Sequence, residues 1–456
     1  MEPVHPTRDG TWQRMMGRRD VLKLGAAIAA GGAVTPLLAA CASPATTGAS
    51  VSITAIVGGA DPSTEPALKK VYDDFKGLHP AVEWDIRALP GLGPEWDRLA
   101  RAALASGEPV GLVELDGLFV RAWARDGLLA DLSADPRMAE VLARVPDRFH
   151  LGGLGETGVR AFPLAMTRGV QTTGLYYNKA LLDQAGLEPP KTIADLKAMV
   201  KPLSALGAAP LVHSSGDASF NPLLVMWILP MIAERAGDPI EFVESTIKGE
   251  VGYDSPEWVE AFQTIADLRT SGVLLEGSGA TDYATMQQLV LQGKAATTYN
   301  GSWMLSQLQA GTPTVPFELH VGPLPTLDGT STAHSIVAWG GFALPVKATA
   351  NRDSVYEFLE YASRAEVDKS VVEGLQSYSP IAESNVAIHD EVAREFLPMF
   401  DDAIPSLNWL WEPEIDAEMS DQVQALVKGA TAPASVGKAI EAVAQELRSS
   451  GRSYYP

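Results

Sequence analysis

Cysteine is almost absent from this chain, because Cys41 is the only one among 456 residues. A disulfide within the chain is therefore excluded, and packing alone must hold the core together. Basic residues are also few. The whole chain has a formal net charge of −21. Residues 1–40 hold five basic and three acidic side chains and so contribute +2, which leaves a charge of −23 on the remainder. Such a surface repels phosphate backbones and anionic lipids, which argues against nucleic acid as a partner and against electrostatic membrane binding.

Motifs for catalysis and metal binding are lacking too. The chain has no Gly-x-Ser-x-Gly elbow, no His-Glu-x-x-His, no phosphate-binding loop and no dinucleotide fingerprint. Its seven histidines show no metal-ligand spacing. We therefore expect no metal, no cofactor and no catalytic residue, although a catalytic pair among the 56 acidic residues stays open at this point.

The N-terminal segment has the layout of an export signal. Basic residues that include Arg18 and Arg19 precede an apolar stretch over residues 21–40, which ends in Leu-Ala-Ala before Cys41. This order resembles a bacterial lipobox, in which the cysteine becomes the lipid-modified N-terminus. Glycines and a proline inside the stretch argue against a membrane-spanning helix. We predict a signal peptide over residues 1–40, exported by the general or the twin-arginine route, and a flexible leash over 41–50.

Beyond the leash, segments whose apolar residues have the two-residue spacing of strands are followed by segments whose apolar residues have the spacing of helices. A β-rich run over 51–57 precedes a segment whose apolar residues recur at helical spacing up to Phe75, and strand patterns follow over 82–87 and 110–115. Further along, Thr192 and Asp195 have the spacing of a helix capping box. Strands separated by helices predict an α/β fold with largely parallel sheets flanked by helices. Ligands of such sheets bind beyond the carboxyl ends of the strands.

Four segments combine aromatic and polar side chains at or near such strand ends. They are residues 299–303, 338–341, 376–380 and 408–411. Sugar rings have apolar C–H faces and hydroxyl rims, so they are bound by flat aromatic faces together with carboxylates and amides. Glycine lets the backbone approach a ligand closely. A single Trp is more often part of a core, but four such segments favour a sugar-binding site.

The order of several motifs along the chain identifies a family resemblance. These motifs are Ala105–Pro109, Asp126–Leu132, Gly174–Leu182, Ala185–Thr192, Gly293–Ala296 and Asn300–Trp303. Together they resemble family 1 extracellular solute-binding proteins of ABC importers, the relatives of maltose-binding protein. The resemblance implies a type II periplasmic-binding-protein-like fold, in which two α/β lobes joined by hinge strands enclose a ligand cleft. It implies lobe bounds of 51–165 plus about 340–385, and about 170–335 plus about 390–456.

The matching segments also imply which side chains contact the ligand. Aromatic residues would stack on sugar rings, acids and amides would bind hydroxyls, and glycines would line the hinge. Ser219 departs from the family pattern, because maltose-binding protein has Tyr there. The candidate ligand contacts are Trp303, Trp339, Gly340, Gly341, Tyr378, Trp411, Trp409, Asp217, Phe220, Asp116, Asp61, Asn300 and Arg168.

The expected function is that of a monomeric, lipid-anchored substrate-binding protein at the outer face of the cytoplasmic membrane. It would capture a carbohydrate by hinge closure and deliver it to an ABC transporter permease. Arg168 leaves a phosphorylated or acidic solute open. Two alternatives remain: an envelope glycosidase that shares the aromatic cleft, and a sensory lipoprotein that binds without transport.

Overall fold

The computed structural model describes the chain from residue 50 onward, with short gaps. The described residues are 50–58, 65–89, 93–107, 109–150, 158–167, 169–330, 335–337, 340–347, 351–401 and 403–454. The predicted signal peptide with Cys41 lies outside these residues, and so do Asp61, Arg168 and Trp339. The predictions for these positions are therefore not tested by the structure.

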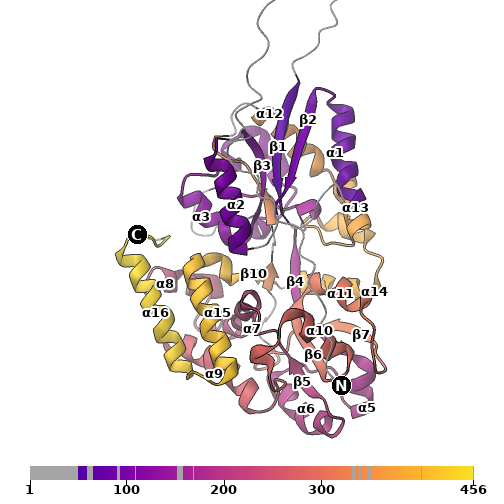
Figure 1. Cartoon of the computed structure of the whole chain (residues 1–456), viewed down its shortest axis with the longest axis vertical. Coiled ribbons are helices and arrows are strands. Elements are labelled where there is room, and N and C mark those ends of the chain that lie inside the picture. Colours follow the sequence, from indigo (N-terminus) through magenta and orange to yellow (C-terminus); the bar gives the residue numbers. More distant parts are fainter. Residues whose placement is uncertain are drawn as a thin grey trace, which may run out of the picture. The chain divides into compact units, whose positions relative to one another are not determined.

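The first sheet has four strands in the order β2-β1-β3-β9. Their bounds are β1 Val51–Val57, β2 Val82–Ala88, β3 Val110–Asp116 and β9 Gly340–Ala343. Strands β2 and β3 both run parallel to β1, as the alternating strand and helix pattern predicts, whereas the late strand β9 joins β3 in the antiparallel sense. This sheet and its helices form what we call the N-terminal lobe (Figure 1).

Helices of the N-terminal lobe bury one apolar face each against this sheet or against a neighbouring helix. In α1, Pro66 occupies the first turn, where a missing N–H costs nothing, and Leu68, Val71, Tyr72 and Phe75 are buried. The helices are α1 Pro66–Leu78, α2 Gly93–Ala105, α3 Gly117–Arg125, α4 Ala139–Leu142, α12 Arg352–Ala362 and α13 Ala365–Leu375.

The second sheet is more mixed than the predicted, mainly parallel one. Its strand order is β10-β8-β4-β6-β5, with β7 also paired to β4. The bounds are β4 Gln171–Asn178, β5 Ala209–Val212, β6 Ala295–Gly301, β7 Leu319–Gly322, β8 Ser335–Val337 and β10 Ile404–Pro405. Strand β5 is parallel to β6, but β4 is antiparallel to three neighbours, because the chain that enters from the N-terminal lobe runs against the helix-connected strands.

Helices around this second sheet complete what we call the C-terminal lobe. The predicted capping box opens α6, where the Thr192 hydroxyl accepts from the Asp195 N–H and the Asp195 carboxylate accepts from the Thr192 N–H. The helices are α5 Lys179–Ala185, α6 Ile193–Ala205, α7 Asn221–Ala233, α8 Pro239–Ile247, α9 Pro256–Thr270, α10 Tyr283–Leu291, α11 Leu305–Ala310, α14 Glu391–Glu395, α15 Pro413–Lys428 and α16 Pro433–Ser449.

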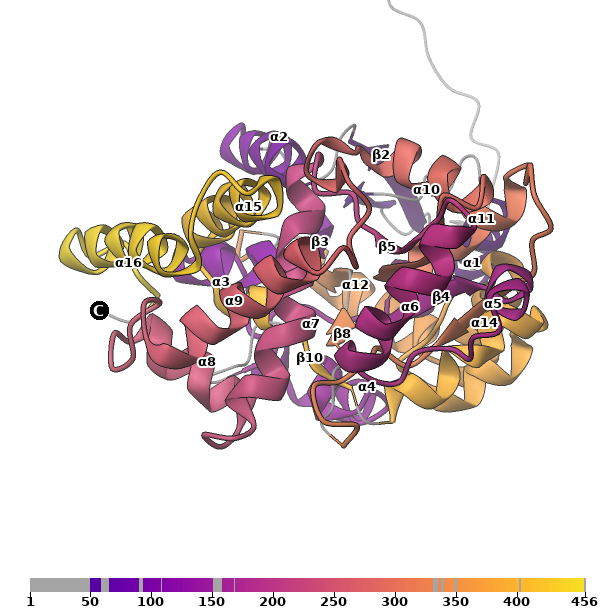
Figure 2. The ribbon, with the colours of Figure 1, turned by 90° about the horizontal axis from the view of Figure 1, so that it is seen from below.

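One core of the C-terminal lobe lies between helices. Helix α7 is buried along its whole length, as its run of large apolar residues predicts, and it packs against α9 and α15. Helix α16 packs against α9 and α15 in turn, so that these helices lie side by side (Figure 2). Trp227, Trp258 and Trp411 are all fully buried in this core.

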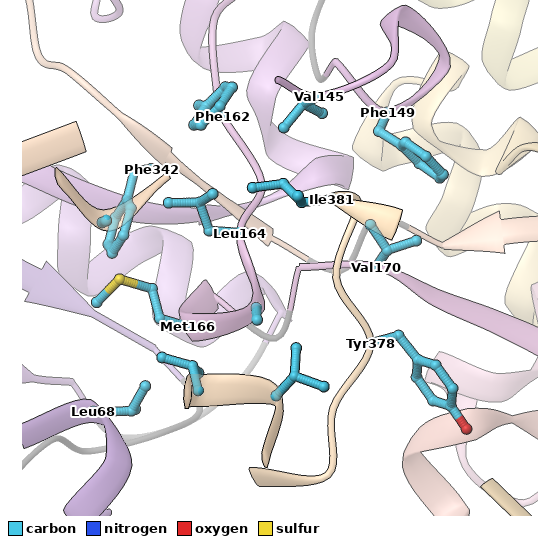
Figure 3. Close-up of a cluster of buried hydrophobic side chains, with 14 of the residues drawn as sticks. Leu68, Val145, Phe149, Phe162, Leu164, Met166, Val170, Phe342, Tyr378 and Ile381 are labelled. Atoms are coloured by element: carbon cyan, nitrogen blue, oxygen red, sulfur yellow. The ribbon is translucent and has the colours of Figure 1, made fainter. Parts of the chain in front are cut away.

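Another buried cluster continues from the N-terminal lobe into the C-terminal lobe through the two connecting segments around Val170 and Tyr378, which we call the hinge segments. Phe342 belongs to β9 of the first sheet and Phe162 forms a bridge with it, and Leu164 and Ile381 connect them with Val170 and Tyr378 (Figure 3). Val170 and Tyr378 also form an isolated antiparallel bridge between two hinge segments. The lobes therefore share an apolar layer at the hinge.

These observations give the predicted fold class, an α/β chain with two sheets flanked by helices. In the part of the chain that the structure describes, no helix combines the length and apolar composition that crossing a membrane requires.

Candidate functional site

A pocket of about 560 Å³ lies at the ends of elements from both lobes. The N-terminal lobe contributes the start of α1 and the end of α13, and the C-terminal lobe contributes β4, the turn after β6, α11 and α14. Its volume is within the range that holds a small-molecule ligand. The lining residues are Glu65, Gln171, Ser302, Trp303, Leu305, Ser306, Gln307, Gln309, Gly374, Leu375, Gln376, Ser377, Tyr378, Asp390 and Ala393.

Three side chains of this pocket carry buried polar atoms that lack a hydrogen-bond partner among the described residues. They are Oε1 of Gln171, Oγ of Ser302 and Oγ of Ser377. Gln171 is only 9% exposed and Ser302 only 7%. Leaving a buried polar atom without a partner costs free energy, so these three atoms offer hydrogen bonds to a polar ligand that reaches them.

Trp303 supplies the aromatic wall of this pocket. It follows β6 in the short 3-10 helix η7, Ser302–Met304, and its side chain is half-buried. The indole packs against all three apolar clusters of the protein, but one part of it remains at the pocket. The structure therefore places this predicted residue where a ring could stack on a ligand.

Behind Trp303 lies Tyr283, a residue that the sequence analysis did not single out. The Tyr283 ring stacks on Phe220, with centroids 4.3 Å apart and planes 2° apart. The Tyr283 N–H donates to Oδ2 of Asp217 at 2.7 Å. Burial raises the pKa of Tyr283 and the neighbouring Trp303 side chain lowers it, while the Tyr283 hydroxyl itself is buried with no hydrogen-bond partner among the described residues. Tyr283 thus brings Asp217 and Phe220, two predicted residues, together with Trp303.

Asp116 lies where the first sheet meets the hinge. It ends β3 opposite Gly340 of β9, and its carboxylate caps α3 by accepting from the Leu118 N–H at 2.9 Å. Burial raises the pKa of this carboxyl to about 6. Gly341 packs so tightly against the backbone of Phe162 that an added Cβ would lie 3.0 Å from its atoms. The predicted hinge glycines therefore occupy a place where the two chain segments touch.

Asp416 of α15 lies close enough to Asp116 for the charges of the two carboxylates to interact. Burial, and then the negative charge of Asp116, raise the pKa of Asp416 to about 7, while a hydrogen bond with Asn408 lowers it. Oδ1 of Asp416 is buried without a partner among the described residues. No local motif marks Asp416, and only its tertiary neighbours distinguish it from the other acids of α15.

The predicted aromatic segment at residues 408–411 is packed into the protein. Trp411 is fully buried in the helical core of the C-terminal lobe, 6.2 Å from the Trp258 ring centroid to centroid. Trp409 is 7% exposed and packs in the cluster of the N-terminal lobe that contains Phe119 and Trp123. The structure does not bring either indole to the pocket lining.

Tyr378 lines the pocket, whereas Asn300 lies in β6 and is fully buried, outside the lining. The Tyr378 hydroxyl donates to the Ala393 carbonyl at 2.8 Å, and burial raises its pKa. Oδ1 of Asn300 accepts from the Gly301 N–H at 2.9 Å, whereas its Nδ2 is buried with no partner in the described ranges. Tyr378 thus contributes mainly its ring to the pocket lining, and the side-chain amide of Asn300 retains a donor without a partner.

Within the described ranges, no group of three or more His, Cys, Asp or Glu side chains could hold a metal ion. His213, at the end of β5, bonds through Nδ1 to Oγ of Ser215 at 2.8 Å, and burial lowers its pKa to about 3. It is therefore a neutral structural residue near neutral pH.

Comparison with known proteins places the chain among binding proteins. The model of the family described as bacterial extracellular solute-binding protein matches residues 61–369. A probable sugar-binding periplasmic protein of Brucella suis is 25% identical over 261 residues, or 56% of this chain and 57% of that protein. The sn-glycerol-3-phosphate-binding periplasmic protein UgpB of Brucella melitensis is 29% identical over 218 residues, which cover 45% of this chain and 46% of that protein. The chain thus spans about half the length of the curated relatives it matches.

Solved structures show the same fold over nearly the whole chain. The GacH receptor of Streptomyces glaucescens, solved unliganded and with acarbose, superposes with a TM-score of 0.69 at 20% identity and covers 87% of this chain and 98% of that one. A chitin oligosaccharide binding protein gives 0.70 at 20% identity, covering 88% and 99%. Maltose-bound MalE3 of T. maritima gives 0.64 at 21% identity, covering 87% and 99%. At these identities the likeness establishes the fold alone.

Proposed function

The chain belongs to the bacterial extracellular solute-binding protein family, and from this premise we propose that it captures a carbohydrate outside the cell and delivers it to an ABC transporter permease. Membership in a family of binding proteins, not enzymes, sets aside the glycosidase alternative. The proposal is that the two lobes close over the sugar and that the closed form docks on the permease.

One observation carries the carbohydrate assignment. The half-buried indole of Trp303 shares a pocket with the unpartnered oxygens of Gln171, Ser302 and Ser377. A sugar ring offers an apolar face to the indole and hydroxyl donors to these oxygens.

Charge at the pocket favours an uncharged sugar over a phosphorylated one. The carboxylates of Glu65 and Asp390 line the pocket. They would repel a phosphate group, which is what the glycerol-phosphate-binding relatives are named for. We therefore propose a neutral oligosaccharide, with Trp303 as the stacking residue.

Further contacts in the cleft are proposed on the same basis. Stacking and positioning would involve Phe220 and Tyr378, and hydroxyl binding would involve Asp116, Asp217 and Asn300. Gly340 and Gly341 would form part of the hinge. Asp61, Arg168 and Trp339 keep their predicted contact roles, and the lobe bounds given above remain a proposal as well.

A thermal-shift screen tests the carbohydrate assignment. The probes are maltotriose, raffinose, chitotriose and, as the charged contrast, glycerol 3-phosphate, added to the chain from residue 42 onward. A sugar present at a hundredfold excess over its Kd should raise the free energy of unfolding by about 2.7 kcal/mol. Stabilisation by glycerol 3-phosphate but by none of the sugars would contradict the proposal.

Lobe closure has its own measurement. Small-angle X-ray scattering with and without the sugar that stabilises most should show a smaller radius of gyration in the bound state. An unchanged radius at saturating sugar would count against capture by closure.

Anchoring at Cys41 is proposed from the lipobox resemblance and is separable from binding. Cys41→Ser in the full chain should move the protein from the membrane fraction to the soluble fraction, while the sugar affinity stays unchanged. A mutant that remains membrane-bound after a salt wash would show that the anchor lies elsewhere.

A further inference from the structure

The glycine before Trp303 has no conformational reason to be a glycine. Gly301 ends β6 with φ −88° and ψ 168°, a backbone conformation that any residue adopts. Both of its backbone polar groups are held: its N–H donates to Oδ1 of Asn300 at 2.9 Å, and its carbonyl accepts from the Tyr176 hydroxyl at 2.9 Å. Neither the backbone torsion angles nor the backbone polar groups require a glycine at position 301. We therefore attribute the glycine to the space that a side chain would occupy there.

The space is taken by the indole of Trp303. A Cβ added to Gly301 would lie 1.8, 2.1 and 2.2 Å from three carbons of the Trp303 six-membered ring. The turn at η7 therefore folds the indole back onto the backbone of Gly301. Because Asn300 and Tyr176 fix that backbone, a side chain at position 301 would displace the ring and not the strand.

A second support comes from Tyr283. Its ring stacks on Phe220 with the centroids 4.3 Å apart, and its backbone is held by the hydrogen bond from its own N–H to Asp217 at 2.7 Å. The Trp303 side chain lies beside the Tyr283 hydroxyl, which has no hydrogen-bond partner among the described residues, and both rings pack against the same apolar cluster. Trp303 thus lies between a glycine that gives it room and an anchored tyrosine.

We infer that Gly301 and Tyr283 are positioning residues that hold the indole of Trp303 in its place at the pocket wall. This inference rests on the proposed function, since it concerns how the stacking residue of that site is oriented. A ring that is already placed loses little freedom when a sugar binds, and this preorganisation favours affinity.

The central test is Gly301→Ala, with Gly322→Ala as the matched control. Gly322 lies in β7, where an added Cβ would meet only the Tyr177 ring at an ordinary 3.5 Å. With 5-fluorotryptophan labelling, the Trp303 resonance is assigned from its loss in Trp303→Phe. We expect this resonance to shift in Gly301→Ala and to stay in Gly322→Ala. An unmoved resonance in Gly301→Ala would overturn the inference.

A double mutant separates this clash from general damage to the strand. Gly301→Ala should lower the melting temperature of the wild type but not that of Trp303→Ala, because the smaller residue leaves room for the new methyl group. An equal loss in both backgrounds would mean that the methyl group clashes with something other than the indole, and the inference would fail. This arm needs no ligand.

Maltotriose affinity gives the functional readout. We expect Gly301→Ala to raise the Kd at least about tenfold, and to add less than about twofold when Trp303 is already Ala. Tyr283→Leu should raise the Kd by about tenfold and Tyr283→Phe by about threefold, whereas Tyr177→Leu, which removes a stack on His320 away from the pocket, should leave it unchanged. Wild-type affinity in both Gly301→Ala and Tyr283→Leu would contradict the inference. If the wild type binds no sugar, the proposed function fails, while the fluorine and melting measurements still decide the positioning.

Discussion

Two short segments of this protein look alike in sequence and differ in structure. Asn300–Trp303 and Asn408–Trp411 both begin with Asn and end with Trp, and both were predicted to contact the ligand. In the structure, Trp303 is half-buried at a pocket wall, whereas Trp411 is fully buried against Trp258. The difference comes from the surroundings of each segment and not from its local sequence.

Polar groups around the two segments show the same contrast. Beside Trp303, the hydroxyl of Ser302 is buried without a partner in the described part of the chain. In the other segment, the Leu410 carbonyl accepts from Nη1 of Arg121 at 3.2 Å, and Oδ1 of Asn408 accepts from the Ser406 hydroxyl at 2.6 Å. Nε1 of Trp411 is also buried without a partner among the described residues, but it lies in the helical core, so of the two segments only Asn300–Trp303 has an unpartnered polar atom in a residue of the pocket lining.

Trp411→Ala should give the largest effect on stability. Removing a fully buried indole leaves a cavity, and such changes cost about 3–5 kcal/mol of unfolding free energy. We expect a large fall in the melting temperature, with an unchanged sugar Kd at a temperature where the variant is still folded. A clear loss of affinity without loss of stability would restore Trp411 as a ligand contact.

Trp303→Ala should have the opposite profile. Only part of this indole is buried, so the melting temperature should fall much less than in Trp411→Ala. Sugar affinity should drop by about 2 kcal/mol, or roughly 30-fold in Kd, as at aromatic hot spots. Trp303→Phe, which keeps a smaller ring, serves as the control and should lose less. If Trp303→Ala melts as low as Trp411→Ala and keeps its Kd, the contrast between the two segments disappears.

Asp416→Asn should have the smallest effect, and it depends on pH. The raised pKa, about 7, means that the folded state holds a proton between about pH 4 and pH 7 that the unfolded state releases. Stability of the wild type therefore falls as pH rises through this window. The Asn variant has no carboxyl to ionise, so its stability does not fall in this way. At pH 8 its free energy of unfolding should exceed that of the wild type by on the order of 1–2 kcal/mol, allowing for partial solvent screening.

Urea denaturation of Asp416→Asn at pH 8 and pH 5 measures this difference. The gain should shrink at pH 5, where the wild-type carboxyl is protonated. Asp421→Asn, on an exposed position of the same helix, is the matched control and should change little at either pH. Equal stability of Asp416→Asn and wild type at pH 8 would mean that the Asp416 carboxyl is less buried than the structure places it.

Much of the fold was predictable from local patterns. The spacing of Leu68, Val71, Tyr72 and Phe75 predicted α1, and the Thr192–Asp195 spacing predicted the start of α6, because these signals depend on neighbours a few residues away. The antiparallel pairing of β4 was not predicted. It depends on the direction in which the chain crosses between the lobes, which periodicity does not encode.

The site was predictable only in part. The Asn-Gly-Ser-Trp motif pointed to Trp303, but the same reasoning applied to Trp411, whose burial is decided by Trp258 far away in sequence. Tyr283 was missed because it opens an ordinary helix and gains its role from Asp217 and Phe220. Residues whose importance lies in such distant contacts leave no local signal in one sequence.

A crystal structure of the complex with the sugar that stabilises the protein most tests the central claim directly. The account predicts a sugar ring stacked on the indole of Trp303, with its hydroxyl groups bonded to Gln171, Ser302 and Ser377. A sugar bound elsewhere, with these three oxygens still lacking a partner and the indole uncovered, would contradict it.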